Sequence, residues 1–321
     1  MSYQIVRFRH LGRTDWGILR DTTLTPLPGE FATTGALVKA IAALDLGALS
    51  RAEVDLRDVT LLSPVTRNQQ FVCQGANYRQ HMLESGIDPE RKTFNMIFTK
   101  AASCIVAADS DVVRPRRVRF LDYEVELGLI LRRAIRGPVD VTDENLHEYV
   151  AAAVIVNDYS ARDVQIPEMQ FYKGKSFRTF GPVGPHLAMI DASNVGLLRQ
   201  LRLTLRVNGE VRQDDTTANL VHGPAETLTE LSRVQDFDAG DLLATGTPAG
   251  CALTVPSPAK QRVGALLPEA VRWRLFMQLQ AKRTEYLKPG DLVEARIRSE
   301  DGQLDLGVQR NRIVCEEEVT S

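Results

Sequence analysis

The sequence predicts an α+β fold whose main body is rich in β-strands and is preceded by a small N-terminal domain. From residue 70 onward, short apolar runs are separated by Gly, Pro and Asn turns, and few segments have the length of a helix. Before that point, short strand-like segments are followed by an Ala- and Leu-rich stretch with helical periodicity. The chain has 321 residues, which is enough for two domains with a sizeable buried core.

The N-terminal domain is expected to cover residues 1–64. Its helix is predicted from Gly35 to Leu49, and its strands lie in three segments: YQIVRFRH, WGILRD and TLTPLPG. This domain carries no chemical motif, so we expect it to support the rest of the chain. The boundary falls near Pro64, and residues 65–321 are expected to form the main domain.

Local patterns in the main domain predict single elements. Asn208-Gly209 separates two alternating segments and supplies the positive backbone angles of a two-residue hairpin turn. Pro224 predicts a short helix that runs to Arg233, because a proline at the first helical position loses no hydrogen bond. The Pro-Gly-Asp sequence at 289–291 predicts a turn that leads into a strand.

Residues 268–287 are predicted to contain an amphipathic helix. Val271, Leu275 and Leu279 recur at helical spacing, while the basic residues lie mostly on other faces. A helix of this length is marginal alone in water, so we expect these three side chains to be buried against the mouth of a site or against another subunit. Over a site, Arg272 or Arg274 would be able to meet a substrate carboxylate.

Composition excludes several classes of function. Lys and Arg total 39 against 41 Asp and Glu, a formal charge of -2, so no overall field attracts nucleic acid or an anionic membrane. No apolar run approaches the roughly 18 residues of a membrane helix. The four cysteines are far apart and show no CxxC spacing, which indicates reduced thiols and a cytoplasmic setting.

An acidic segment, LDYEVELGLIL, alternates apolar and charged side chains. In a strand this alternation places Asp122, Glu124 and Glu126 on one face. If that face is buried, carboxylates this close need a cation or protons, and oxygen ligands favour a hard ion such as Mg²⁺, Mn²⁺ or Ca²⁺. The pattern is also typical of a solvated strand edge, so the segment alone leaves both interpretations open.

Asp158 closes the apolar run AAAVIVND, and a carboxylate at the end of a buried strand is well placed to reach a site. A turn or a helix cap is the alternative explanation for Asp158. Arg162 follows four residues later and is either a clamp for a substrate or the partner of Asp158.

His81 and Glu84 are three residues apart and share one face if their segment is helical. A carboxylate beside an imidazole can hold it ready to take a proton from water, as general-base catalysis requires. An exposed His and Glu on a surface helix would show the same spacing.

Lys175 lies in FYKGKSFRTFGPVGP, a segment rich in aromatic residues, Gly and Pro. A desolvated lysine there can stabilise an enolate or a carboxylate, whereas a surface lysine would rest its stem against an aromatic ring. The turn ATGTPAG, residues 244–250, either offers the Thr247 hydroxyl and backbone amides to an oxyanion or is a plain turn.

Seven of these motifs, taken together and in order, resemble the fumarylacetoacetate hydrolase family. They are GANYRQH, DYEVELGLIL, NDYSARDVQ, KSFRTFGPVGP, VNGEVRQ, GTPAG and KPGDLVEARI. The resemblance spans about Gln70 to Arg312, which is most of the chain. It implies the family's mixed β-sheet roll for residues 65–321, as a catalytic domain, and a homodimer.

The resemblance also implies roles for single residues. Glu124, Glu126 and Asp158 match the family's metal ligands, for an ion that is usually Mg²⁺, Mn²⁺ or Ca²⁺. His81 matches the histidine that pairs with a glutamate, here Glu84, to activate water. The remaining matches are a catalytic lysine, Lys175, and three substrate-binding residues, Arg162, Gln165 and Thr247.

Two features depart from the family pattern. Gln74 stands where some longer members carry a further carboxylate ligand, so a site of three carboxylates is expected. Shorter members run almost directly from the GTPAG turn to the PGD turn, whereas this chain has an insertion at 251–287 that contains the predicted helix.

The activity implied by the resemblance is hydrolysis of a C–C bond in a 1,3-dicarbonyl or acylpyruvate-type substrate through a metal-stabilised enolate. Such an enolate also serves decarboxylation of an oxaloacetate-like 2-oxo acid and keto–enol isomerisation. The presence of both His81 and Glu84 favours hydrolysis or decarboxylation. A catalytically silent binding protein on the same fold is the alternative of another class.

Overall fold

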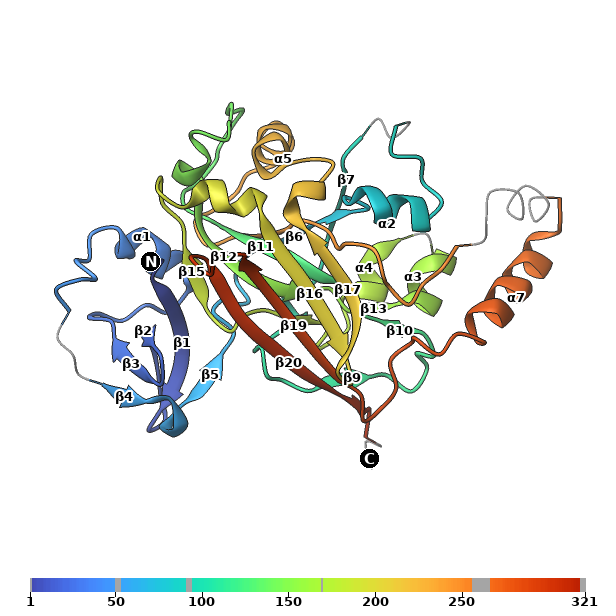
Figure 1. The fold of residues 1–321 in the computed structure, drawn as a ribbon, viewed down its shortest axis with the longest axis horizontal. Coiled ribbons are helices and arrows are strands. Elements are labelled where there is room, and N and C mark those ends of the chain that lie inside the picture. The colour runs from blue at the N-terminus through green and yellow to red at the C-terminus, as the bar shows by residue number, and fades with distance from the viewer. Residues whose placement is uncertain (1, 50–52, 91–93, 169, 256–265, 318–321) are drawn as a thin grey trace.

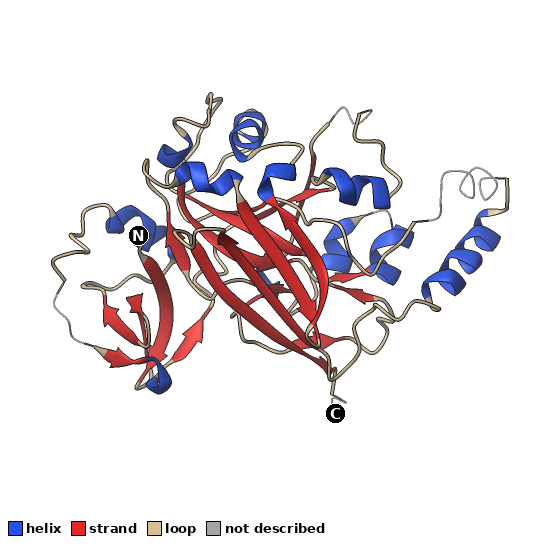
Figure 2. Ribbon diagram, viewed as in Figure 1, coloured by secondary structure: helices blue, strands red, loops and turns tan. Residues whose placement is uncertain are grey.

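Strands make up most of the body, and short helices lie around them (Figure 2). The computed structural model describes residues 2–49, 53–90, 94–168, 170–255 and 266–317. A long mixed sheet and a second sheet of five strands form the body, and the N-terminal strands lie at one end of it (Figure 1). The predicted β-rich α+β fold is confirmed.

The N-terminal segment forms antiparallel strands and one helix. The strands are β1 (Gln4–His10), β2 (Arg13–Arg20), β3 (Thr23–Pro26), β4 (Val54–Asp55) and β5 (Thr60–Leu62). Helix α1 spans Thr34–Ile41 and so ends before the predicted Leu49; the Thr33 side chain caps its start by accepting from the Ala36 N–H. Strand β1 also pairs with β15 (Leu187–Met189), so these strands extend the long sheet.

The long sheet has two fully buried strands at its centre. Its strands beyond β1 are β15, β12 (Val150–Asn157), β11 (Val125–Leu131), β18 (Leu242–Ala244), β6 (Phe71–Gly75) and β7 (Met96–Thr99), in that order. Every residue of β11 and β12 is buried, as expected for strands that are covered on both faces. Gly128 lets them pack closely, because a Cβ there would lie 2.7 Å from Val156 and 2.9 Å from Val154.

The second sheet faces solvent on one side. Its strands, in order, are β17 (Glu210–Thr216), β16 (Leu201–Val207), β19 (Leu292–Ser299), β20 (Asp305–Cys315) and β9 (Val112–Arg114). Buried and exposed residues alternate along β16, so one face packs on the core. Strands β16 and β17 form the predicted hairpin, with φ angles of 52° at Asn208 and 84° at Gly209.

The remaining elements are short. The other strands are β8 (Ile105–Val106), β10 (Leu121–Asp122), β13 (Ser160–Ala161) and β14 (Gly181–Pro182). The other helices are α2 (Arg79–Glu84), α3 (Arg162–Glu168), α4 (Phe171–Lys175), α5 (Pro224–Leu231) and α7 (Glu269–Gln280). The 3₁₀ turns are η1 (Leu56–Asp58), η2 (Ala102–Cys104), η3 (Leu146–Glu148), η4 (Val195–Arg199) and η5 (Thr217–Asn219). Within the described ranges, no helix is long and apolar enough to cross a membrane.

Helix α7 forms where the insertion was predicted to be helical, but the predicted buried face is wrong. Of the three predicted residues, Val271 is partly buried but Leu275 and Leu279 are 44% and 50% exposed, whereas Trp273, Phe276 and Met277 are partly buried and Gln280 is buried. Positions 273, 276, 277 and 280 also lie on one helical face, and they bring the larger apolar side chains inward. Gln280 is tolerated there because its amide donates to the Thr254 carbonyl and accepts from the Tyr286 hydroxyl. Residues 256–265 of the insertion lie outside the described ranges.

His186, just before β15, predicts how stability depends on pH. It is buried, and its Nε2 donates to the Asp305 backbone carbonyl at 3.0 Å. Burial lowers the pKa of His186, so the folded chain keeps the imidazole neutral where the unfolded chain binds a proton. We therefore expect the free energy of unfolding to fall as the pH decreases below about 6.5, the ordinary histidine pKa.

Urea unfolding at about pH 7.5 and about pH 5.5 measures this effect. His186→Gln should lose less stability between the two pH values than the wild type, because the amide does not titrate. His10→Gln, at the partly exposed end of β1, is the matched control and should behave as the wild type does. Equal losses in all three proteins would show that His186 does not contribute.

Candidate active site

Most of the predicted site residues line one cavity of about 480 Å³. Seven of them contribute to its walls: His81, Glu124, Glu126, Arg162, Gln165, Lys175 and Thr247. Asp158 does not belong to the lining, but its carboxylate contacts the ammonium of the lining residue Lys175. Glu84 is on α2 with His81 but does not line the cavity. The cavity is therefore the candidate active site.

The three predicted metal ligands lie together because β11 and β12 pair in antiparallel register. Glu126 is in β11 opposite Val156, and Asp158 follows the last residue of β12. Glu124 lies in a break between β10 and β11, so the predicted unbroken strand is interrupted there. The Asp158 N–H donates to the Glu124 carbonyl at 2.8 Å, which fixes the two residues side by side. Carboxylate oxygens of all three lie within 4.8 Å of one another, and all three side chains are buried.

Two buried lysines balance part of this negative charge. The Lys175 ammonium bridges Glu124 and Asp158, and Lys100 pairs with Asp158 and donates to the Phe180 carbonyl. Burial alone would lower the pKa of Lys175, but Asp158 and Glu124 outweigh it, and the pKa is raised. The pKa of Lys100 is likewise raised by Asp158 against the effect of burial. Both lysines therefore remain cationic.

Glu126 has no such partner among the described residues. Its carboxylate accepts the Gly246 backbone N–H at 3.0 Å, and no ion pair reaches it within that part of the chain. Burial, followed by the charges of Asp158 and Glu124, raises the pKa of Glu126 well above its ordinary value. The cluster is thus short of positive charge at Glu126.

These residues fit a divalent cation. Three buried carboxylates with converging oxygens form a hard donor set of the kind that Mg²⁺, Mn²⁺ and Ca²⁺ prefer. The unbalanced carboxylate of Glu126 is the structural sign that further positive charge suits the cluster. Whether the three act as ligands stays a prediction.

Arg162 is a structural partner of the acidic segment. Its guanidinium donates to Asp122 at 2.8 Å, to the Gln165 side-chain carbonyl at 2.7 Å, and to Glu124. One of the two interpretations made Arg162 the partner of Asp158. The described structure shows no such pair. Asp122 also accepts the backbone N–H of Ala252 at 2.7 Å, so it ties the acidic segment to the chain beyond the GTPAG turn. The Gln165 side-chain oxygen is thus already engaged by Arg162.

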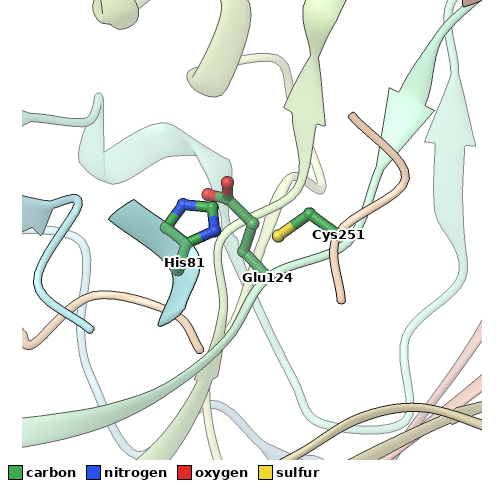
Figure 3. Close-up of side chains that lie close together, drawn as sticks. All are labelled: His81, Glu124 and Cys251. Atoms are coloured by element: carbon green, nitrogen blue, oxygen red, sulfur yellow. The ribbon is translucent and has the colours of Figure 1, made fainter. Parts of the chain in front are cut away.

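His81 stands at the cavity wall as a neutral base. Figure 3 shows its ring close to the Glu124 carboxylate and the Cys251 thiol, and one ligand atom of each lies within 4.8 Å of the other two. Its Nδ1 is buried and has no hydrogen-bond partner among the residues that the structure describes. Burial lowers the pKa of His81, although the charge of Glu124 acts in the opposite direction. At neutral pH the imidazole is therefore able to accept a proton.

The predicted His81–Glu84 pair is not hydrogen-bonded in the described structure. The Glu84 carboxylate accepts the Gly250 backbone N–H at 3.0 Å instead. The helix does place both residues on one face, but the free amide of the GTPAG turn competes for Glu84. Thr247 is similarly engaged: its hydroxyl donates to the Val125 carbonyl at 3.0 Å and accepts from Gln213 at 2.8 Å.

Sequence reasoning missed two residues of this site. Lys100 is fully buried in the apolar segment NMIFTKAAS, and a single lysine between apolar runs was the available signal. Cys251 follows the GTPAG turn directly, and nothing local in the sequence distinguishes it from the other cysteines.

The chain matches known families over nearly its whole length. A model described as Fumarylacetoacetate (FAA) hydrolase C-terminal matches residues 70–314, and one described as Rv2993c-like, N-terminal matches residues 4–64. Similar proteins include "Oxaloacetate tautomerase FAHD2A, mitochondrial" of Bos taurus, 35% identical over 72% of this chain and 71% of that protein. "Oxaloacetate tautomerase YisK" of Bacillus subtilis is 32% identical over 65% of this chain and 68% of that protein.

Solved structures agree with the sequence comparisons. The fumarylacetoacetate hydrolase from psychrophilic Exiguobacterium antarcticum aligns with a TM-score of 0.73 and 27% identity, covering 98% of this chain and 100% of that chain. The fold is therefore shared over nearly the whole of this chain.

Replacing Glu126 tests whether the cluster binds a metal ion. Because its charge is unbalanced, we expect Glu126→Gln to weaken Mn²⁺ or Mg²⁺ binding by roughly tenfold or more, measured by isothermal titration calorimetry. The exposed Glu144 provides the control, and Glu144→Gln should bind the ion as the wild type does. No measurable binding to the wild type would mean that Lys175, Lys100 and Arg162 are the only cations of the cluster.

Proposed function

Because the chain belongs to the fumarylacetoacetate hydrolase family, we propose that it acts on a small 2-oxo acid or 1,3-dicarbonyl compound and forms the enolate of that substrate in the cavity. The observation that carries the proposal is the buried group of carboxylates and cations with a neutral imidazole at its edge. Enolate chemistry needs a base for a carbon-bound proton and positive charge for the oxygen that becomes negative. The described site supplies both.

Different residues of the chain provide the base and the positive charge. His81 is the base, since its imidazole is neutral at neutral pH and lines the cavity. Lys175 cannot take a proton because its pKa is raised, so it holds negative charge that develops on the substrate. A divalent cation held by Glu124, Glu126 and Asp158 would supply Lewis-acid polarisation of the substrate oxygens. The low exposure of the charged groups strengthens each of these interactions.

Keto–enol tautomerisation is the reaction that this geometry supports best. It needs one base: His81 takes the proton from the carbon next to the carbonyl, and the same proton is then returned to the carbonyl oxygen. No activated water is required. Glu84 is bound to the Gly250 amide, so the pair that would activate water is not assembled. Relatives named oxaloacetate tautomerase support the same proposal.

C–C bond hydrolysis remains a second candidate, and one observation favours it. The His81 Nδ1 is buried and finds no partner within the described part of the chain, and Glu84 lies one helical turn away on α2. A rotation of the Glu84 side chain from Gly250 towards that nitrogen would create the water-activating pair. Water would then add to the carbonyl carbon, the adjacent C–C bond would break, and the enolate would take a proton.

Proton NMR in D₂O separates the two reactions. Oxaloacetate and a set of 2,4-dioxo acids would be incubated with the purified protein in the presence of Mg²⁺ or Mn²⁺. Tautomerisation exchanges the protons between the carbonyl groups for deuterium and leaves the carbon chain intact. Hydrolysis releases pyruvate and a carboxylic acid. Neither exchange nor cleavage of any substrate would contradict the proposed function.

His81 and Glu84 give the corresponding mutational prediction. His81→Gln should lower the exchange rate by roughly a hundredfold to ten-thousandfold, as expected for loss of a general base, while metal affinity stays unchanged. Glu84→Gln should keep most of the exchange activity if the reaction is tautomerisation. A loss as large as that of His81→Gln, together with loss of cleavage, would favour the hydrolase mechanism.

A further inference from the structure

The cavity is lined by buried charged side chains and by partly exposed apolar side chains. The charged side chains that line it, Glu124, Glu126, Arg162 and Lys175, are all buried. The apolar side chains that line it are partly exposed and so lie nearer the solvent; they include Ile87, Met96, Ile166, Phe171, Leu253 and Phe276. A substrate whose reacting atoms lie among the charged groups therefore meets an apolar wall with its other end.

Among the described residues, that wall offers no positive charge for a second carboxylate. Arg162 and Lys175 are the cationic side chains of the described lining, and both are already bound to carboxylates of the cluster. Arg272 and Arg274, which the sequence suggested as substrate contacts, are exposed on α7 and do not belong to the described lining. A carboxylate at this end of a substrate would lose water without gaining a partner.

The insertion at 251–287 contributes Leu253, Val255 and Phe276 to this wall, and Phe276 is the one that lies on α7. Gln280, one helical turn later, anchors the end of α7 through the Thr254 carbonyl at 2.9 Å and the Tyr286 hydroxyl at 2.7 Å. Met277 packs against the main core next to it. The Phe276 ring also meets Trp273 edge to face, with 5.5 Å between ring centroids. These contacts hold the ring against the cavity, while Leu275 points elsewhere and is 44% exposed.

We propose that the substrate is a 2-oxo acid or 2,4-dioxo acid whose non-reacting end is an uncharged alkyl or aryl group, and that Phe276 sets this preference. The inference rests on the proposed function for the reacting end. The apolar wall would contact the other, non-reacting end of the substrate, and this contact would define the substrate class.

A series of 2,4-dioxo acids tests the proposal. The tail would lengthen from methyl to hexyl, and matched members would end in a carboxylate. For the wild type, kcat/KM should rise by about fourfold per added methylene until the wall is covered, as expected for burial of apolar surface. Members that end in a carboxylate should be turned over less efficiently than their alkyl counterparts.

Substitutions in α7 test whether Phe276 is responsible for the preference for uncharged tails. Phe276→Ala should lose most of the gain with tail length, through a higher KM and with little change in kcat for the methyl member. Phe276→Lys should raise the relative efficiency towards carboxylate-ended members. Leu275→Ala is the matched control on the same helix and should keep the wild-type series. A flat series for the wild type, or equal series for Phe276→Ala and Leu275→Ala, would overturn the proposal.

Binding without turnover gives an independent readout. Trp273 touches Phe276, and the second tryptophan, Trp16, is buried in the N-terminal strands, so it contributes a constant background. Simple 2-oxo acids with longer tails should change tryptophan fluorescence at lower concentration than pyruvate does. If no dioxo acid is turned over, the proposed function fails. The inference about the wall then stands with such a ranking of affinities and falls without it.

Discussion

The burial of carboxylates side by side is the constraint on which the arrangement of the site depends. Asp122, Glu124, Glu126 and Asp158 are each almost fully removed from solvent, and uncompensated charge there would be expensive. Arg162, Lys175 and Lys100 supply three cations to these four acids. Backbone amides from the GTPAG turn and beyond add hydrogen bonds to Glu126 and Asp122. Segments far apart in the sequence are thus tied to one cluster by charge as well as by packing.

The two sheets make this concentration of charge possible. Strands β11 and β12 are buried along their whole length, so packing fixes the positions of their ends. The interruption between β10 and β11 then directs Glu124 towards Lys175 and Arg162. The apolar core positions the acids, and the cations that gather around them hold the surrounding helices α3 and α4.

Local sequence patterns predicted what depends on local geometry. Asn208-Gly209 fixed the hairpin because only a few residues tolerate positive φ, and alternation in the acidic segment anticipated that Glu124 and Glu126 lie close together. The contacts that the sequence did not reveal join residues far apart in the chain. Glu84 meets Gly250 across 166 positions, and Lys100 meets Asp158 across 58. The face that α7 buries was ambiguous for a similar reason, because Gln280 becomes suitable for burial only where Thr254 and Tyr286 are present.

The pairing of β1 with β15 gives the N-terminal strands a role that their lack of chemistry would not suggest. Without them, β15 would be the outermost strand of the long sheet, with only β12 beside it. Its unpaired N–H and C=O groups would then form an open edge, which is the kind of surface on which chains associate into aggregates. The segment before residue 65 thus covers the edge that β15 would otherwise present. We therefore expect a fragment that begins at residue 65 to expose this edge and to be less soluble than the whole chain.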